Sequence, residues 1–196
     1  WDHTHQRLKM IDQRLLTGEF REVSFSRYEQ VAEAIQQMVV RGAPAIGASA
    51  AFGMVLAANA ATTSDITVFK GEMIKAGEVL QAARPTAVNL AWAITRLLRV
   101  VEKFEAGGAD DLRAEMLAEA QLIADQDVQI NKQMAAHGAN MMGENETVIH
   151  HCNTGALATV DWGTALGVIR MAQEQGKNPH VLVDETRPRL QDARLT

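Results

Sequence analysis

Apolar residues recur at helical spacing through most of the chain. Val31, Ile35 and Val39 share one face, which predicts a helix that begins at Tyr28 and ends near Arg41. We expect the apolar positions of the helices to form the core, including Ile74, Ile130 and Met134. The same spacing predicts further helices that begin at Pro44, cover 64–82, run from Pro85 to Gly107-Gly108, and cover 110–138.

Two parts of the chain follow a strand pattern instead. Residues 8–23 combine short apolar runs with Gly18, which predicts strands joined by a turn. Further along, 147–152 and 180–184 are predicted strands, and 164–175 between them is a predicted helix. A strand-helix-strand unit with short connections requires parallel strands, and it puts a ligand crevice at their carboxyl ends.

These elements predict an α/β fold in three parts. They are a strand-and-turn segment (1–24), a helical domain (25–143), and the first half of a Rossmann-like parallel α/β domain (144–196). Two parallel strands and one helix cannot bury both faces of such a sheet. We therefore expect the sequence to be a fragment of a longer protein, and the chain alone to expose an apolar sheet face.

Composition narrows the function classes. The 196 residues carry 19 Lys and Arg against 24 Asp and Glu, and this net charge of −5 argues against a nucleic-acid surface or a polybasic membrane patch. Cys152 is the single cysteine, so no intramolecular disulfide forms and a cytoplasmic location is expected. The stretch 43–61 is uncharged but mostly Ala and Gly, which favours a buried core helix over a membrane span.

An arginine stands just before a proline at two predicted helix starts, in Arg41-Gly42-Ala43-Pro44 and in Arg84-Pro85. Free N–H groups at a helix N-terminus attract anions, Gly42 permits close backbone approach, and a guanidinium binds phosphate through two parallel hydrogen bonds. Together the two motifs predict a phosphate-binding clamp. The alternative is that each arginine is a solvated loop residue and each proline only begins a helix.

Cys152 follows the first predicted strand of the α/β part, directly before Asn153-Thr154-Gly155. At the carboxyl end of a parallel strand, next to a helix, a thiolate is favoured and ligands bind. Catalysis by Cys152 is therefore one interpretation. The other is that Cys152 packs as a small buried side chain of the sheet.

Other chemistry has less support in the sequence. The segment after Cys152 lacks the second glycine of G-x-G-x-x-G, and no P-loop Gly-Lys-Ser/Thr occurs, so we expect no nucleotide cofactor. His150 and Cys152 are predicted to share a strand face, and His3 and His5 form another pair two residues apart. Neither pair has an evident third or fourth ligand, so we expect no metal. Asp125 and Asp127 predict only a solvated helix face.

Four longer blocks resemble the methylthioribose-1-phosphate isomerase family, in that family's order and over nearly the whole chain. They are Arg41-Gly42-Ala43-Pro44-Ala45-Ile46-Gly47, Arg84-Pro85-Thr86-Ala87-Val88-Asn89-Leu90, Cys152-Asn153-Thr154-Gly155-Ala156-Leu157-Ala158-Thr159 and Asp184-Glu185-Thr186-Arg187-Pro188-Arg189-Leu190-Gln191. The family belongs with the regulatory subunits of the translation-initiation guanine-nucleotide exchange factor and with ribose-1,5-bisphosphate isomerase. The resemblance therefore implies the fold more directly than the substrate.

The resemblance also implies roles for individual residues. It implies that the substrate phosphate region is held by Arg41, Gly42 and Ala43. It implies that Arg84 and Gln191 contact the substrate, and that Cys152 lies at the reacting carbons.

Some of the family's pattern is missing or altered. The catalytic Asp of the family stands in a Gly-Ala-Asp-Arg block, followed by an Asn-Lys pair that touches substrate, both beyond Thr196. The chain alone is therefore expected to be inactive. Asp192 stands where the family usually has Gly, and Val160-Asp161-Trp162 replaces a Gly-rich stretch. We expect the first change to perturb the loop that presents Gln191.

The implied reaction converts 5-methylthioribose 1-phosphate to 5-methylthioribulose 1-phosphate in methionine salvage, without a cofactor and in a cytoplasmic homodimer. Phosphate on the anomeric oxygen blocks spontaneous ring opening, so an acid must protonate the ring oxygen while hydrogen moves from C2 to C1. Two alternatives remain open. A ribose-1,5-bisphosphate isomerase needs an additional cationic contact in place of an apolar methylthio pocket, and a non-catalytic regulatory or scaffold subunit does not need Cys152.

Overall fold

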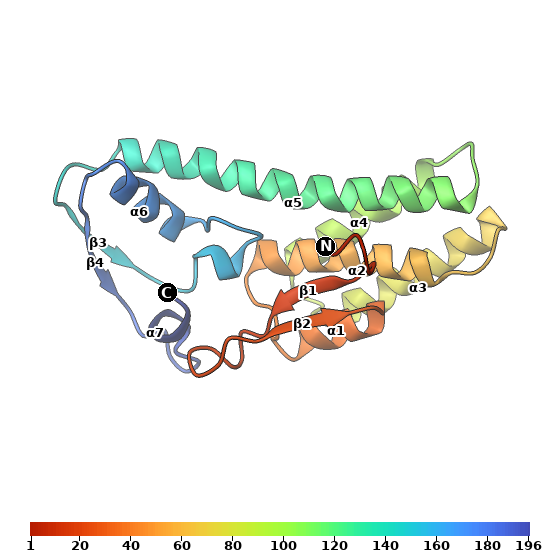
Figure 1. The fold of residues 1–196 in the computed structure, drawn as a ribbon, viewed down its shortest axis with the longest axis horizontal. Coiled ribbons are helices and arrows are strands. Elements are labelled where there is room, and N and C mark those ends of the chain that lie inside the picture. The colour runs from red at the N-terminus through yellow and green to blue at the C-terminus, as the bar shows by residue number, and fades with distance from the viewer.

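The computed structural model describes residues 1–196 (Figure 1). The chain opens with an antiparallel pair, β1 (Leu8–Ile11) and β2 (Glu22–Phe25), in which Leu8 lies opposite Phe25. This confirms the predicted strand-and-turn entry. The pair lies on the helical part, because β1 contacts α2 (Ala43–Ala60) and β2 contacts α1 (Tyr28–Gln36).

Helix α2 is the centre of the helical part. Its small residues allow close packing, since a Cβ on Gly53 would lie 3.1 Å from the Leu80 side chain and one on Gly47 would lie 3.1 Å from the Asn89 carbonyl oxygen. By length and composition α2 could span a membrane, but 78% of it is buried inside the structure, as predicted for a core helix. It contacts α1, α3 (Ile66–Ala82), α4 (Val88–Lys103) and α5 (Ala109–Asn140).

The predicted end of α1 near Arg41 is wrong, because the helix ends at Gln36. Met38 has a φ of 61°, and the N–H groups of Met38 and Val39 donate to the carbonyls of Ile35 at 3.3 Å and Ala34 at 2.8 Å. This is the Schellman pattern of helix termination, in which the left-handed residue is usually glycine. A methionine takes that place here, so the sequence holds no ordinary stop signal before Gly42.

The predicted helix start at Pro85 is also wrong. Pro85 and Thr86 lie in a turn that is closed by a 3.0 Å hydrogen bond from the Ala87 N–H to the Arg84 carbonyl, and α4 begins at Val88. Proline favours the second position of such a turn as well as the first turn of a helix, because both need the same φ. The Arg84 motif is therefore a turn that precedes a helix.

Three apolar positions predicted for the core are on the surface. Ile74 is 52% exposed, Ile130 60% and Met134 39%. In the second half of α5 the buried side chains are Asn131, Ala135 and Ala139, none of them long and apolar, and this helix packs on α6 (Ala165–Glu174). The long apolar side chains of this half therefore face outward.

The predicted parallel strand pair is confirmed. β3 (Thr147–His150) pairs in parallel with β4 (His180–Val183), in the register Thr147 with His180, and α6 lies between them in sequence. This is consistent with part of a Rossmann-like domain. Ile149 is 75% exposed, so the pair also has the expected apolar surface. The three-part domain division stays a prediction, and α5 packs on α6 across its second boundary.

A short helix near the end of the chain, α7 (Gln191–Leu195), was not predicted. It lies beside the loop that joins β1 to β2 (Figure 1). Arg194 fixes this arrangement, because its Nε donates to the Leu16 carbonyl at 3.1 Å and its Nη2 donates to the Arg14 carbonyl at 3.0 Å. The segment that precedes α7 is thereby held close to Arg41.

Candidate active site

The N-terminus of α2 is pressed against the loop that follows Cys152. Gly42 is the N-cap of α2 and has a φ of 97°, and Pro44 stands in the first turn. A Cβ on Gly42 would lie only 2.2 Å from the carbonyl oxygen of Ala158, in the 3-10 turn η1 (Ala156–Ala158). Glycine is thus required here by both conformation and space, and the backbone that approaches it is that of the chain itself.

We expect Gly42→Ala to destabilise the protein by about 2 kcal/mol or more, because it combines a strained φ with a backbone clash. Gly71→Ala in α3 is the matched control, since nothing lies within 4 Å of its Cβ, and it should stabilise the helix by about 0.5–1 kcal/mol. Urea unfolding measures both free energies. Equal free energies of unfolding for the two variants would mean that Gly42 does not contact η1 in solution.

Cys152 lies just past the end of β3, half-buried, with a φ of 68°. Its N–H donates to Asp192 Oδ2 at 2.6 Å, and the Nε2 of Gln191 lies 4.0 Å from its Sγ. The Gln191 Oε1 is buried and has no hydrogen-bond partner. The structure therefore brings together Cys152 and Gln191, and leaves an amide oxygen free to accept a hydrogen bond beside the thiol.

Asp192 fixes the backbone of the loop that contains Cys152. Its carboxylate is buried, and it accepts hydrogen bonds from the Cys152 N–H, from the hydroxyl of Thr186, and from the hydroxyl of Thr196 at 3.3 Å. His150 Nδ1 lies 3.9 Å from Asp192 Oδ1. Asp192, which stands where the family usually has Gly, therefore anchors the backbone of Cys152 through a hydrogen bond. The expected effect of Asp192 on the loop that presents Gln191 stays a prediction.

The predicted pairing of His150 with Cys152 on one strand face is wrong. Cys152 leaves the strand in a left-handed conformation, and His150 is buried with its Nε2 2.6 Å from the Thr154 hydroxyl oxygen. That oxygen also accepts the N–H of Leu166 at 3.0 Å, so the Thr154 hydroxyl can donate to the imidazole. His150 thus connects β3 to the start of α6. No group of three or more His, Cys, Asp or Glu side chains is arranged to hold a metal ion.

Arg41 is half-buried and forms no ion pair. Burial lowers the pKa of its guanidinium, the nearby positive charge of Arg189 lowers it further, and Cys152 acts in the opposite direction. Arg84 is also near enough to contribute to the lowered pKa. The predicted phosphate-binding arginines are therefore electrostatic neighbours, and Ala43 lies exposed beside them at the start of α2.

Sequence reasoning missed Arg189, which stands two residues before Gln191. It forms no ion pair, whereas the neighbouring Arg187 is paired with Glu185 at 2.8 Å. The Arg-Pro-Arg sequence of 187–189 could have indicated an anion-binding residue here. It did not indicate which of the two arginines lies near Arg41.

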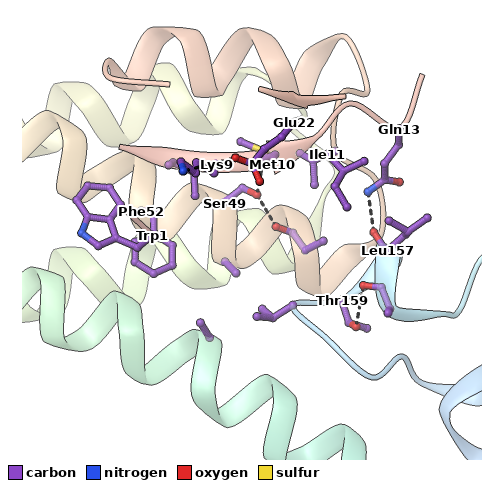
Figure 2. A pocket seen from close by; sticks show the side chains of 17 residues that line it. Trp1, Lys9, Met10, Ile11, Gln13, Glu22, Ser49, Phe52, Leu157 and Thr159 are labelled. Carbon is purple, nitrogen blue, oxygen red and sulfur yellow. Dashed lines mark hydrogen bonds and ion pairs between the residues drawn. The ribbon is translucent and has the colours of Figure 1, made fainter. Parts of the chain in front are cut away.

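A mostly apolar cavity of about 330 Å³, which Lys9 and Glu22 also line, lies between β1, α2, α5 and η1 (Figure 2). Trp1 stacks on Phe52 at one end, with ring centroids 5.4 Å apart. At the other end the Nε2 of Gln13 donates to the Leu157 carbonyl at 2.7 Å (Figure 2). Gln13 also lines a second, arginine-rich cavity that contains Arg41, so an apolar space and a cationic space adjoin at this residue.

The prediction that Asp127 belongs to a solvated helix face is wrong, although Asp125 is exposed as predicted. Asp127 is half-buried on α5, where its Oδ2 accepts the Val160 N–H at 2.8 Å. Burial raises the pKa of this carboxyl, and the hydrogen bond from Val160 opposes the shift. Asp127 therefore ties the loop that follows η1 to α5.

Trp162 lies in the stretch that departs from the family's pattern. Its ring receives the Arg170 guanidinium at 4.0 Å and the Lys132 ammonium at 5.3 Å from the ring centroid. A Cβ on Gly167 would lie 2.8 Å from the Trp162 ring. These contacts pack the loop on α5 and α6. A Gly-rich stretch has no side chains that could make such contacts.

Comparison with known proteins assigns the chain to a family. Residues 39–196 match the model of the Initiation factor 2 subunit family, and the chain belongs to this family. A curated relative, the methylthioribose-1-phosphate isomerase of Synechococcus sp., is 49% identical over 193 residues, which cover 98% of this chain and 55% of the relative. The chain thus spans about half the length of the curated relatives it matches.

Solved structures agree with this assignment. The crystal structure of 5-methylthioribose 1-phosphate isomerase from Pyrococcus horikoshii matches with a TM-score of 0.93 and 43% identity, over 99% of this chain and 54% of that one. A structure described as translation initiation factor eIF-2B, subunit delta, from A. fulgidus matches with a TM-score of 0.88 and 42% identity, over 100% and 56%. The resemblance to the isomerases is confirmed, as is the fold class.

Proposed function

We propose that this chain carries the phosphate-binding and thiol-bearing half of a methylthioribose-1-phosphate isomerase of methionine salvage. The observation that supports this most is the juxtaposition at one site of Cys152, Gln191 and Arg41, three residues from three separate sequence blocks. Curated relatives that are 45–50% identical bear the isomerase name. Cytoplasmic location and a homodimer are further parts of the proposal that the resemblance implies.

The reaction is an isomerisation that balances within the substrate. The bond between C1 and the ring oxygen breaks, the ring oxygen gains a proton, the hydrogen on C2 moves to C1, and the C2 hydroxyl loses its proton as the carbonyl forms. Arg41, with the backbone of Gly42 and Ala43, would hold the phosphate, and Arg84 would add a second positive charge. Fixing the phosphate orients C1 and C2 toward the thiol.

Cys152 and Gln191 would act at the reacting carbons. A thiol near cationic groups transfers protons more readily than a hydroxyl, because its pKa lies closer to neutrality. The free Gln191 Oε1 is suited to accept a hydrogen bond from a sugar hydroxyl. The apolar cavity beside Gln13 would receive the methylthio end and restrict water there.

The acid that protonates the ring oxygen is not among these residues. No Gly-Ala-Asp-Arg block occurs in the 196 residues, and we propose that this chain alone binds substrate without turning it over. The test is to compare the chain alone with the chain fused to the downstream part of the Synechococcus relative, following 5-methylthioribose 1-phosphate by ³¹P NMR. Conversion only by the fusion supports the proposal; no conversion by a folded fusion overturns it.

A second candidate is isomerisation of ribose 1,5-bisphosphate. It is favoured by one observation, the number of arginines around the cavity that contains Arg41, because a second phosphate needs further cationic contacts. The apolar cavity that adjoins it favours a methylthio group instead. Comparing how the two sugar phosphates bind separates these functions.

A further inference from the structure

The second cavity that Gln13 lines, of about 540 Å³, is strongly cationic. It opens where the loop after β1, the end of α1 and the segment before α7 meet. Four of its nine lining residues are arginines, namely Arg14, Arg41, Arg189 and Arg194, and none is Asp or Glu. We call it the arginine cavity.

Two of these arginines already have partners. The Arg14 Nε and Nη2 donate to Asp12 at 2.9 and 2.7 Å, and its Nη1 donates to Gln37 at 2.9 Å. Arg194 donates to the backbone carbonyls of Leu16 and Arg14. Their role is to shape the cavity, because their donors are largely used.

Arg41 and Arg189 have no such partners. Neither guanidinium takes part in an ion pair or a side-chain hydrogen bond within the chain, although each carries five N–H donors. Arg41 is half-buried and Arg189 is exposed, and both line the cavity. Their charges repel one another, since each arginine stays protonated at neutral pH and Arg189 lowers the pKa of Arg41. An anion between them would relieve this repulsion.

The chain connects this cavity to the thiol. Only Leu190 separates Arg189 from Gln191, whose Nε2 lies 4.0 Å from Cys152 Sγ. A group bound by Arg189 would therefore be fixed by the same short segment that presents Gln191 to Cys152. A phosphate monoester is the group whose size, charge and oxygen geometry suit two guanidinium forks.

We propose that Arg189 is a second phosphate-binding residue, which closes on a phosphate monoester dianion from the side opposite Arg41. Assigning that phosphate to the sugar substrate rests on the proposed function, whereas the anion site itself does not. Arg189 then contributes specificity for phosphorylated ligands, and it couples phosphate binding to the position of Gln191.

The test uses the 196-residue chain and two probes, inorganic phosphate and 5-methylthioribose 1-phosphate, titrated by calorimetry. Arg189→Ala should weaken the binding of both probes at least tenfold, and Arg189→Gln, which keeps a polar side chain but removes the positive charge, should weaken it similarly. Arg187→Ala is the matched control, because its side chain is 79% exposed and paired with Glu185, and it should change binding less than twofold. Thermal unfolding of each variant verifies that it is folded.

The outcomes separate the two proposals. If the Arg189 variants bind both probes like the wild type while Arg41→Ala does not, the role of Arg189 is refuted and the proposed function stands. If the Arg189 variants lose phosphate binding but the sugar phosphate binds no better than inorganic phosphate, the anion site stands and the proposed function fails. Equal losses in Arg187→Ala and Arg189→Ala would refute a specific role for Arg189.

Discussion

Replacing Cys152 with serine is expected to lower turnover by about 10²–10⁴-fold in a chain that carries the downstream acid, with little change in stability. Serine is nearly isosteric and can adopt the same backbone conformation, so its N–H can keep the 2.6 Å hydrogen bond to Asp192. The change removes only the acidity of the thiol, since a serine hydroxyl is a far weaker acid. The kcat of the fusion, measured with 5-methylthioribose 1-phosphate, gives the effect.

The pattern of kinetic constants distinguishes chemistry from packing. A catalytic thiol predicts a fall in kcat with a KM that changes little, because the phosphate contacts are untouched. Cys152→Ala should lose a similar amount. If Cys152→Ser keeps turnover within a few-fold of the wild type, Cys152 is only a small packed side chain, which is the alternative that its partial burial also allows.

Removal of Arg41 is expected to have the second largest effect. Arg41→Ala should weaken the binding of 5-methylthioribose 1-phosphate by about 2 kcal/mol or more, roughly 30-fold, because in the proposed site it removes a half-buried guanidinium that has no other partner. Arg84→Ala should act in the same direction. Calorimetric titration of the 196-residue chain measures both.

Arg21→Ala is the control for this series, since Arg21 is an exposed residue that is already paired with Glu19 at 2.7 Å. Its affinity should match the wild type. Higher salt should weaken binding to the wild type and should weaken it less in Arg41→Ala, because one charge contact has been removed. Unchanged affinity in Arg41→Ala would refute the phosphate-binding clamp.

Regular hydrophobic spacing was enough to predict most of the fold. The parallel pair of β3 and β4 followed from two apolar segments with a helical pattern between them. The α2 helix followed from an uncharged Ala- and Gly-rich stretch. Boundaries were less predictable, because Met38 ends α1 in a conformation that the sequence would assign to glycine, and because Pro85 suits a turn and a helix start equally.

The sequence was enough to predict which residues belong to the candidate site, but not how they are arranged in space. The motifs singled out Arg41, Gly42 and Cys152, whereas the contact of Gly42 with the Ala158 backbone depends on two segments that are far apart in sequence. The same holds for Asp127, which accepts a hydrogen bond from the N–H of Val160, 33 residues further along the chain. Such contacts leave no local pattern, because both partners are ordinary residues in their own segments.

Arg189 shows the limit most clearly. Arg187 and Arg189 flank one proline, and Arg187 pairs with Glu185, which stands only two residues before it in the sequence. The approach of Arg189 to Arg41, by contrast, depends on the tertiary fold, because the two residues are far apart in the sequence.

The proposed substrate preference is measured directly by the ratio of kcat/KM for 5-methylthioribose 1-phosphate and ribose 1,5-bisphosphate in the fused chain. In the proposed function the cavity receives the methylthio group; even one methylene in such a pocket is worth about 10–200-fold in kcat/KM, and a charged phosphate costs more to bury. We expect a ratio at or above that range in favour of 5-methylthioribose 1-phosphate. Preference for the bisphosphate, or no turnover of either sugar by a folded chain, would contradict it.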